Sequence, residues 1–292
     1  MAYMDGNGWV TCGLGHRHWG RFGAAGLLAF VPDGPVLLQR RTWWSHHGGT
    51  WGLPGGARDS HEPAFAAAMR EAAEECGVPA DAGQLRGIFD DDHGGWSYQT
   101  VLLETEKPFA VHAASDETSD AAWVDVGDVT ARSLHPGFAE HWAELRAALH
   151  RLTVIVDGAN VVGSRPDGWW RDRAGAAVRL RDQLEPLARD GIDRLPDAPA
   201  EPVRPHAAIL RMTRLPDIVL VVEGAARPAA DSSGGGRVRV VAARGSGDDT
   251  IAELAAKTPG QRVVVTADRE LRRRCVDAGA SVAGPSWLLD LL

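Results

Sequence analysis

Residues 56–78 read GARDSHEPAFAAAMREAAEECGV, and the pattern of this stretch decides the fold of the first half of the chain. Apolar side chains recur every three or four residues in its second part, which predicts an amphipathic helix, and Gly77 predicts where that helix ends. One face of the predicted helix carries Glu71, Glu74 and Glu75, one turn apart. Like charges at this spacing repel each other, whereas a hard divalent cation takes oxygen ligands. We therefore expect a cation-binding helix face, with a solvated acidic face as the alternative.

The same stretch fills every fixed position of the spacing G-x5-E-x7-R-E-apolar-x-E-E-x-G-apolar. This spacing resembles the signature of the Nudix hydrolases, and the resemblance extends over about residues 20–150. It implies an α/β/α sandwich with a mixed sheet, with residues 1–150 as the Nudix domain. It also implies a hydrolase that uses Mg²⁺ or Mn²⁺ to cleave the pyrophosphate bond of nucleoside-diphosphate-linked substrates.

The resemblance further implies where a metal binds. Glu71, Glu74 and Glu75 would hold the cation together with the main-chain carbonyl of Gly55. The same glutamates are the catalytic candidates, and the resemblance leaves open which carboxylate takes the proton from the attacking water. Glu117 precedes a predicted strand and is the candidate for an additional metal ligand or a base.

Four other residues are implied to act on the substrate or on the glutamates. Arg40 and Arg41 end a predicted strand at a point where arginines of the resembling family reach substrate phosphates, and a planar guanidinium suits that contact. A solvated strand end is the alternative for both. Arg70 is expected to orient the glutamates by ion pairing, and Glu62 is expected to join the same outer shell.

Alternating and apolar runs predict the remaining elements of the first half. The predicted strands are residues 24–30, 36–40, 85–89, 98–104 and 121–126, and a helix is predicted over residues 135–149. An acidic loop, residues 90–95, is expected between the third and fourth of these strands. Its aspartates are interpreted as a solvated turn, with an outer metal shell as the alternative.

Residues 9–22 contain Cys12, His16 and His18 close together. A thiolate and two imidazoles are zinc ligands, but no fourth ligand is evident nearby and the spacing matches no standard zinc site. We therefore favour a structural role or a role at the edge of the substrate site, and keep metal binding as the alternative.

The two halves of the chain differ in charge. Residues 1–150 carry 10 basic and 20 acidic side chains, whereas residues 151–292 carry 21 and 19. A chain of 292 residues has room for two domains of roughly 150 residues. We therefore predict two domains, residues 1–150 and residues 151–292.

Cysteines and apolar runs bear on localisation. No run of about 18 apolar residues is present to span a bilayer, and the first ten residues lack the basic and apolar regions of a secretion signal. The three cysteines are odd in number and far apart, which argues against a disulfide framework. We expect a cytoplasmic protein without a membrane partner, and the sequence does not predict its oligomeric state.

Strand and helix patterns alternate through the second half, which predicts a Rossmann-like parallel sheet with helices on both faces. Polar residues follow the predicted strands or open the helices: Asp157, Asn160, Asp248, Asp249 and Asp268. Because the carboxyl ends of parallel strands share one edge of a sheet, these side chains are expected to converge. Capping and turn formation are the alternative for aspartates in such positions.

These segments resemble the NYN branch of the PIN-like nucleases, through V-D-G-x-N-V from residue 156, G-x-x-D-D from residue 245 and V-x-T-x-D ending at residue 268. The resemblance covers about residues 151–292. It implies RNA as a partner and RNA cleavage with Mg²⁺ or Mn²⁺ held by Asp157, Asp248, Asp249 and Asp268, with Asp157, Asp249 and Asp268 as catalytic candidates and Asn160 beside them.

Three functions fit these patterns. The first is a Nudix hydrolase that acts on nucleotide derivatives, including RNA 5′ ends, fused to a ribonuclease. The second is a Nudix enzyme that sanitises free nucleotides and carries a separate nuclease domain. The third is a non-catalytic nucleotide sensor joined to an RNA-binding module, against which the intact acids in both halves argue.

Overall fold

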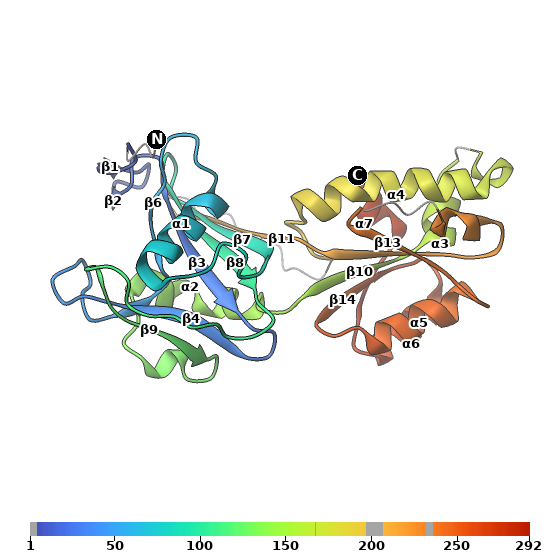
Figure 1. Cartoon of the computed structure of the whole chain (residues 1–292). Helices are drawn as coiled ribbons and strands as arrows, with labels where there is room; N and C mark the ends of the chain where they lie inside the picture. Colours follow the sequence, from blue (N-terminus) through green and yellow to red (C-terminus); the bar gives the residue numbers. More distant parts are fainter. Residues whose placement is uncertain (1–4, 167, 197–206, 232–235) are drawn as a thin grey trace. The chain divides into compact units, whose positions relative to one another are not determined.

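The computed structural model describes residues 5–166, 168–196, 207–231 and 236–292, which form two compact units (Figure 1). Unit 1 consists of Met1–Leu149 and Glu201–Thr213, and unit 2 consists of His150–Ala200 and Arg214–Leu292. The division therefore differs from the expected domains, because a short segment from the second half of the chain belongs to unit 1.

Unit 1 is built on a mixed sheet of eight strands. They are β3 (Ala24–Phe30), β4 (Pro35–Arg41), β5 (Trp51–Gly52), β6 (Gly55–Ala57), β7 (Gln84–Asp92), β8 (Ser97–Glu104), β9 (Thr118–Asp125) and β11 (Ile209–Arg214). The central strand β3 runs parallel to β8 and antiparallel to β4 and β6. The mixed sheet predicted from the sequence is confirmed.

Two helices, α1 (Ala64–Cys76) and α2 (Pro136–Ala147), cover the two faces of this sheet. Successive side chains of a strand point to opposite faces. Leu27 of β3 accordingly packs in one buried cluster with Ala68 of α1, and Leu28 packs in another with Trp142 of α2. Helix α1 ends where the sequence predicts, at Gly77, whose φ of 71° suits a residue without a side chain.

Smaller elements complete unit 1. Strands β1 (Trp9–Thr11) and β2 (Arg17–Trp19) form a separate antiparallel hairpin, and a 3₁₀ turn, η1 (Val129–Ala131), precedes α2. The expectation of an acidic loop over residues 90–95 is wrong for its first three residues. They continue β7, because Asp90, Asp91 and Asp92 pair with Gln99, Tyr98 and Ser97 of β8.

Unit 2 contains a five-stranded sheet in the order β13-β12-β10-β14-β15, and all neighbouring strands run parallel. The strands are β10 (Leu152–Asp157), β12 (Asp217–Val222), β13 (Val238–Ala242), β14 (Gln261–Val265) and β15 (Ser281–Ala283). The helices are α3 (Gly158–Gly163), α4 (Arg173–Asp190), α5 (Gly247–Lys257), α6 (Arg269–Asp277) and α7 (Pro285–Leu289), with 3₁₀ turns η2 (Trp169–Arg171) and η3 (Gly224–Ala230). The predicted parallel sheet is confirmed.

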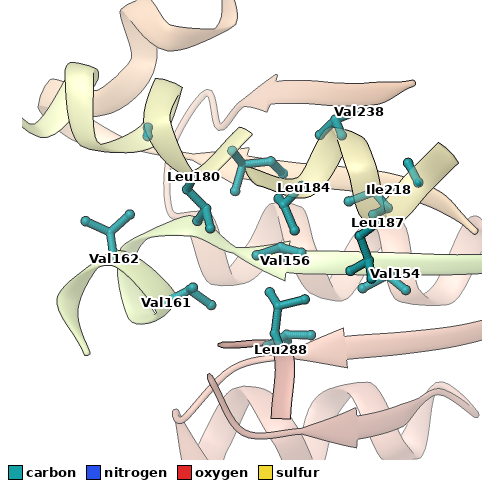
Figure 2. Close-up of a cluster of buried hydrophobic side chains, with 14 of the residues drawn as sticks. Val154, Val156, Val161, Val162, Leu180, Leu184, Leu187, Ile218, Val238 and Leu288 are labelled. Carbon is teal, nitrogen blue, oxygen red and sulfur yellow. The ribbon is translucent and has the colours of Figure 1, made fainter. Parts of the chain in front are cut away.

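Strand β10 lies in the middle of this sheet and is buried on both faces. Val156 packs with Leu180 and Leu184 of α4, in the apolar cluster drawn in Figure 2. On the other face, Ile155 packs with Leu271 of α6. This burial on both faces explains why the strand reads as a continuous apolar run.

None of the helices in the described part of the chain combines the length and the apolar composition that crossing a bilayer requires. All three cysteines are free and buried.

Leu184→Ala should lower the free energy of unfolding of unit 2 by about 2–5 kcal/mol, because the lost side chain is fully buried and leaves a cavity beneath α4. Hydrogen exchange of the β10 and β12 amides in the full chain would measure this for unit 2 alone. Val276→Ala on α6 is the control: its side chain is 54% exposed, and the expected change is below about 0.5 kcal/mol. Equal losses in the two variants would contradict the core described above.

Candidate active site

The acidic residue at the end of α1, Glu75, lies inside the protein and is only 5% exposed. Its Oε2 accepts hydrogen bonds from the backbone N–H of Gly55 at 2.8 Å and from Nε2 of Gln39 at 2.9 Å. Thr118 fixes Gln39 in turn, by donating its hydroxyl to Gln39 Oε1 at 2.6 Å. Burial, with a contribution from the charge of Glu71, raises the pKa of Glu75 to about 8.

Arg70 holds two other acidic residues of the predicted site. Its Nε and Nη2 donate to the two carboxylate oxygens of Glu62 at 3.0 and 2.9 Å, and its Nη1 donates to Glu71 at 2.7 Å. A further bond from Nη2 to the carbonyl of Ala57 at 3.0 Å ties Arg70 to β6. The bonds from Arg70 lower the pKa of Glu62, whereas burial raises the pKa of Glu71. Arg70 therefore neutralises the side of the acidic cluster at Glu62 and Glu71, whereas Glu75 is influenced more weakly by the charge of Arg41.

Two glycines let β6 approach the acids closely. A Cβ on Gly56 would lie 2.6 Å from the carboxylate of Glu71, and a Cβ on Gly55 would lie 2.4 Å from the carbonyl oxygen of Ala25. Neither position has room for a side chain. Gly56, the first residue of the sequence signature, must therefore be a glycine because it lies in contact with the carboxylate of Glu71.

Glu74 lies beside this core of the site, with its side chain 61% exposed and 3.9 Å from Arg70. Glu117 is exposed next to the buried Thr118, and its charge contributes to the raised pKa of Glu75. The structure therefore brings Glu62, Arg70, Glu71, Glu74 and Glu75 together and places Glu117 near them.

Arg40 and Arg41 diverge, because a β-bulge shifts the register of β4 between them. Arg41 lines a cleft of about 1060 Å³ that also reaches Gly55. Arg40 is exposed and donates from Nε to the carbonyl of Gly49 at 3.2 Å. The structure thus brings Arg41 to the cleft and directs Arg40 to the loop after β4.

The cleft lies within unit 1 and has an aromatic lining, which includes Phe89, Trp96, Tyr98 and Phe138. In one wall of the cleft, the carboxylate of Asp91 lies between two histidine rings, 3.2 Å from Nε2 of His93 and 3.3 Å from Nε2 of His141. The hydrogen bond with Asp91 raises the pKa of His141. Sequence reasoning missed Gln39, Thr118, Tyr98 and this trio, and only the alternation along the strands could have indicated that some of them point inward.

In unit 2, Asp157 is 4% exposed at the carboxyl end of β10. Its Oδ1 accepts from the backbone N–H of Asn160 at 3.0 Å, and its Oδ2 accepts from the Asn160 side chain at 2.6 Å and from the hydroxyl of Thr266 at 2.8 Å. Asp268 caps α6 by accepting from the backbone N–H of Leu271 at 2.7 Å. Both aspartates therefore act as helix caps as well as lying at the edge of the sheet where convergence is expected.

Asp248 opens α5 close to these residues. Its pKa is raised by burial and by the charges of Asp157, Asp268 and Glu223. Glu223 follows β12 and accepts from the backbone N–H of Gly247 at 2.7 Å. Sequence reasoning did not select Glu223, although its position directly after an apolar strand is the signal that selected the other acids.

Asp249 is not brought into this cluster. Its side chain is 73% exposed and accepts from Arg274 of α6 at 2.8 Å. The expectation that Asp249 joins Asp248 in one acidic cluster is therefore wrong. Consecutive residues in a helix point about 100° apart, so only one of the two can face the sheet edge.

The donor set around α1 fits a hard divalent cation. Burial raises the pKa of both Glu71 and Glu75, with contributions from the charges of Glu74 and Glu62 at Glu71 and of Glu71 at Glu75, and a cation between the two carboxylates would offset these effects. In unit 2, the carboxylates of Asp157, Asp248 and Asp268 are also a set of oxygen donors, and a cation among them would offset the raised pKa of Asp248.

Comparison with known proteins places the first half of the chain in a class. Residues 20–145 match the family model described as NUDIX domain. A protein of Mycobacterium tuberculosis named putative 8-oxo-dGTP diphosphatase 3 is 46% identical over 156 residues, which is 49% of this chain and 70% of that protein. The chain belongs to the Nudix family of hydrolases.

Two further relatives match the same half. A nucleoside triphosphate pyrophosphatase/Nudix hydrolase fusion protein of Bifidobacterium longum is 35% identical over 159 residues, covering 52% of this chain and 33% of that protein. The crystal structure of RenU, a Nudix hydrolase from M. smegmatis, shares 43% identity over 48% of this chain and 93% of its own, with a TM-score of 0.45.

Glu75 should make the stability of the chelator-treated protein depend on pH. Its pKa is raised in the folded state, so the folded state binds its proton more tightly than the unfolded state between about pH 4.5 and 8. The free energy of unfolding should therefore fall as the pH rises through this window. Urea unfolding of wild type and of Glu75→Gln, compared at each pH, would isolate the effect, and parallel curves for the two proteins would contradict it.

Proposed function

We propose that unit 1 hydrolyses the phosphate anhydride bond of free nucleotides, with oxidised purine nucleoside triphosphates as the substrate class and Mg²⁺ or Mn²⁺ as cofactor. The observation that carries the proposal is the buried Glu75, held by Gln39 and Gly55 next to the arginine-clamped Glu71. The substrate class is supported by the printed name of the relative with 46% identity.

The chain's own residues divide the work. Glu71, Glu74, Glu75 and the carbonyl of Gly55 are the proposed metal ligands, and Glu117 is the proposed additional ligand or base. A divalent cation at these oxygens would neutralise phosphate charge and lower the pKa of a bound water. Arg70 keeps Glu71 in position through its bonds to Glu62 and β6.

The cleft beside Gly55 suits a nucleotide. Its volume of about 1060 Å³ is at the upper end of ordinary ligand sites, which leaves room for a base, a sugar and a phosphate chain. The wall of the cleft includes the aromatic rings of Phe89 and Phe138, against which a base can pack. Arg41 lies in the same cleft and offers a planar, permanently charged group to the phosphates.

A substrate panel with Mg²⁺ or Mn²⁺ tests the proposal. The full chain would be given 8-oxo-dGTP, dGTP, ADP-ribose, a dinucleoside polyphosphate and a 5′-capped or triphosphorylated RNA, with release of phosphate products followed by chromatography. The highest kcat/KM is expected for the oxidised triphosphate. Preference for the RNA 5′ end would replace this substrate class, and tight binding without any release would favour the sensor function.

Glu75→Gln and Glu74→Gln should each reduce kcat for metal-dependent hydrolysis by at least about a hundredfold, because each removes a proposed ligand while keeping the shape of the side chain. Steady-state kinetics with a circular-dichroism check of folding would measure this. Glu106→Gln, the same change at an exposed glutamate after β8, is the control and should retain wild-type kcat. Turnover at the wild-type rate in Glu75→Gln or Glu74→Gln would contradict the assignment of that glutamate as a metal ligand.

We infer a second activity for unit 2, namely metal-dependent cleavage of RNA by an NYN/PIN-like domain. The specific observation that favours it is the gathering of Asp157, Asp248, Asp268 and Glu223 at one edge of the parallel sheet. Helix capping explains the positions of Asp157 and Asp268, but it does not explain why Asp248 faces three other acids at a cost to its ionisation.

The neighbours Asp248 and Asp249 provide a matched test. Asp248→Asn should abolish cleavage of a labelled single-stranded RNA in Mn²⁺, because Asp248 faces the other acids. Asp249→Asn should retain at least about half of the activity, because its carboxylate is exposed and pairs with Arg274. Equal activity of both variants would contradict the role of the cluster, and wild-type protein without RNA cleavage would overturn the proposal for unit 2.

A further inference from the structure

A group of nitrogen and sulfur ligands lies away from the acids of the Nudix box. It consists of Cys12, His16 and His18 from the β1–β2 hairpin and His93 from the turn between β7 and β8. Each residue contributes one ligand atom, and all of these atoms lie within 4.8 Å of one another. The fourth ligand that the sequence does not reveal is therefore a histidine 75 residues beyond His18, brought in by the fold.

We propose that Cys12, His16, His18 and His93 bind a zinc ion that fastens the β1–β2 hairpin to the β7–β8 turn at the rim of the cleft. One thiolate and three imidazoles form a closed set of four ligands, as in structural zinc sites. In a tetrahedral zinc site, a bound sulfur and a bound nitrogen lie about 3.5 Å apart. The Sγ of Cys12 already lies 3.9 Å from Nδ1 of His93.

His93 has the environment of a metal-bound histidine. Its Nε2 lies 3.2 Å from the carboxylate of Asp91, so its Nδ1 is left facing Cys12. Metal-ligating histidines commonly bind a carboxylate through the other ring nitrogen, which fixes the ring and its tautomer. Asp91 is itself held by His141 at 3.3 Å, so the support extends to α2.

His18 is the second independent indication. Its ring stacks on Trp96 with centroids 3.8 Å apart and an angle of 11° between the planes. Its Nε2 is buried and has no hydrogen-bond partner among the described residues. A buried polar atom without a partner lowers the stability of the folded state, and a bond to a metal would remove this penalty.

A zinc ion would stabilise the short β1–β2 hairpin. Its two strands have three residues each, they lie outside the main sheet, and Trp9 and Trp19 on them are 53% and 45% exposed. A small buried cluster of Cys12, Ala24 and Trp96 packs the hairpin against the sheet, but a two-stranded hairpin of this size is marginal on its own. Its backbone is already shaped for the site, because Cys12 N–H donates to His16 and Gly13 N–H donates to Gly94 in the β7–β8 turn.

The position of the proposed zinc gives it a functional consequence. His16, His18 and His93 line the same cleft as Arg41 and Gly55. A cation there would fix one wall of the proposed nucleotide site and would be separate from a cation bound by the glutamates of α1. Zinc content can therefore be measured independently of hydrolysis.

Untagged full-length protein, purified without chelator, tests the proposal through its metal content. Elemental analysis should find roughly one zinc per chain, and His16→Asn should lower this to near zero. His16 is exposed, so this change leaves the core intact. His47→Asn, in the neighbouring group of His46, His47 and His135, should retain the zinc.

Cobalt reconstitution provides a second readout. Wild-type protein loaded with Co²⁺ should show the visible bands of a tetrahedral site and a thiolate-to-metal charge-transfer band, and Cys12→Ser should lose the latter. Protein that neither contains zinc nor gives these bands with Co²⁺ would overturn the proposal. Zinc that persists in His16→Asn but disappears in His47→Asn would overturn it as well.

Discussion

A carboxylate buried under strand β6 is the constraint around which unit 1 is arranged. Glu75 is shielded from water, and an ionised carboxylate in such a place is costly unless hydrogen bonds or a cation compensate. The chain supplies two donors, Gly55 from β6 and Gln39 from β4, and fixes Gln39 through Thr118 of β9. Strands β4 and β6 and helix α1 thus meet at one oxygen atom of Glu75, and β9 joins them through Gln39. The pKa of Glu75 stays raised, so these two hydrogen bonds compensate only part of the free-energy cost of ionising the buried carboxylate. A bound cation would compensate the rest of that cost, which favours cation binding at this site.

The local part of this arrangement could be predicted from the sequence, and the long-range part could not. Helical periodicity was sufficient to put Glu71 and Glu75 one turn apart on one face, because their separation is set by the helix itself, whereas Glu74 points about 100° away from Glu75 and its side chain is 61% exposed. Gln39 and Thr118 are separated by 79 residues, and their contact depends on the pairing of β4 with β9. Strand β11 was missed for the same reason: a short segment joins a sheet through partners that its own residues do not specify.

In unit 2, the sequence predicted which strand ends carry acidic residues but not which of two adjacent side chains faces the sheet edge. The rule that parallel strands end at one edge predicted that Asp157, Asp248 and Asp268 would approach each other, and the charges of Asp157 and Asp268 contribute to the raised pKa of Asp248. The rule predicts where a strand ends and a helix begins, but not the direction in which each side chain points. It therefore could not predict that Asp248 faces the other acids and that Asp249 does not. The difference is set by the direction in which α5 leaves the sheet, and Arg274 of α6 then fixes the outward carboxylate.

The two kinds of donor cluster in unit 1 follow from the charge of their members. Neutral imidazoles and a thiol can approach one another without repulsion, and in the described part of the chain the groups with ligand atoms within 4.8 Å of one another are those rich in histidine. Carboxylates repel at such distances, so Arg70 offsets the charge of Glu71, while burial and the charge of Glu71 raise the pKa of Glu75 to about 8. The nitrogen and sulfur cluster is consequently suited to a permanent structural ion. The acidic cluster, whose charge changes near neutral pH, is suited to an ion that arrives and leaves with a phosphate substrate.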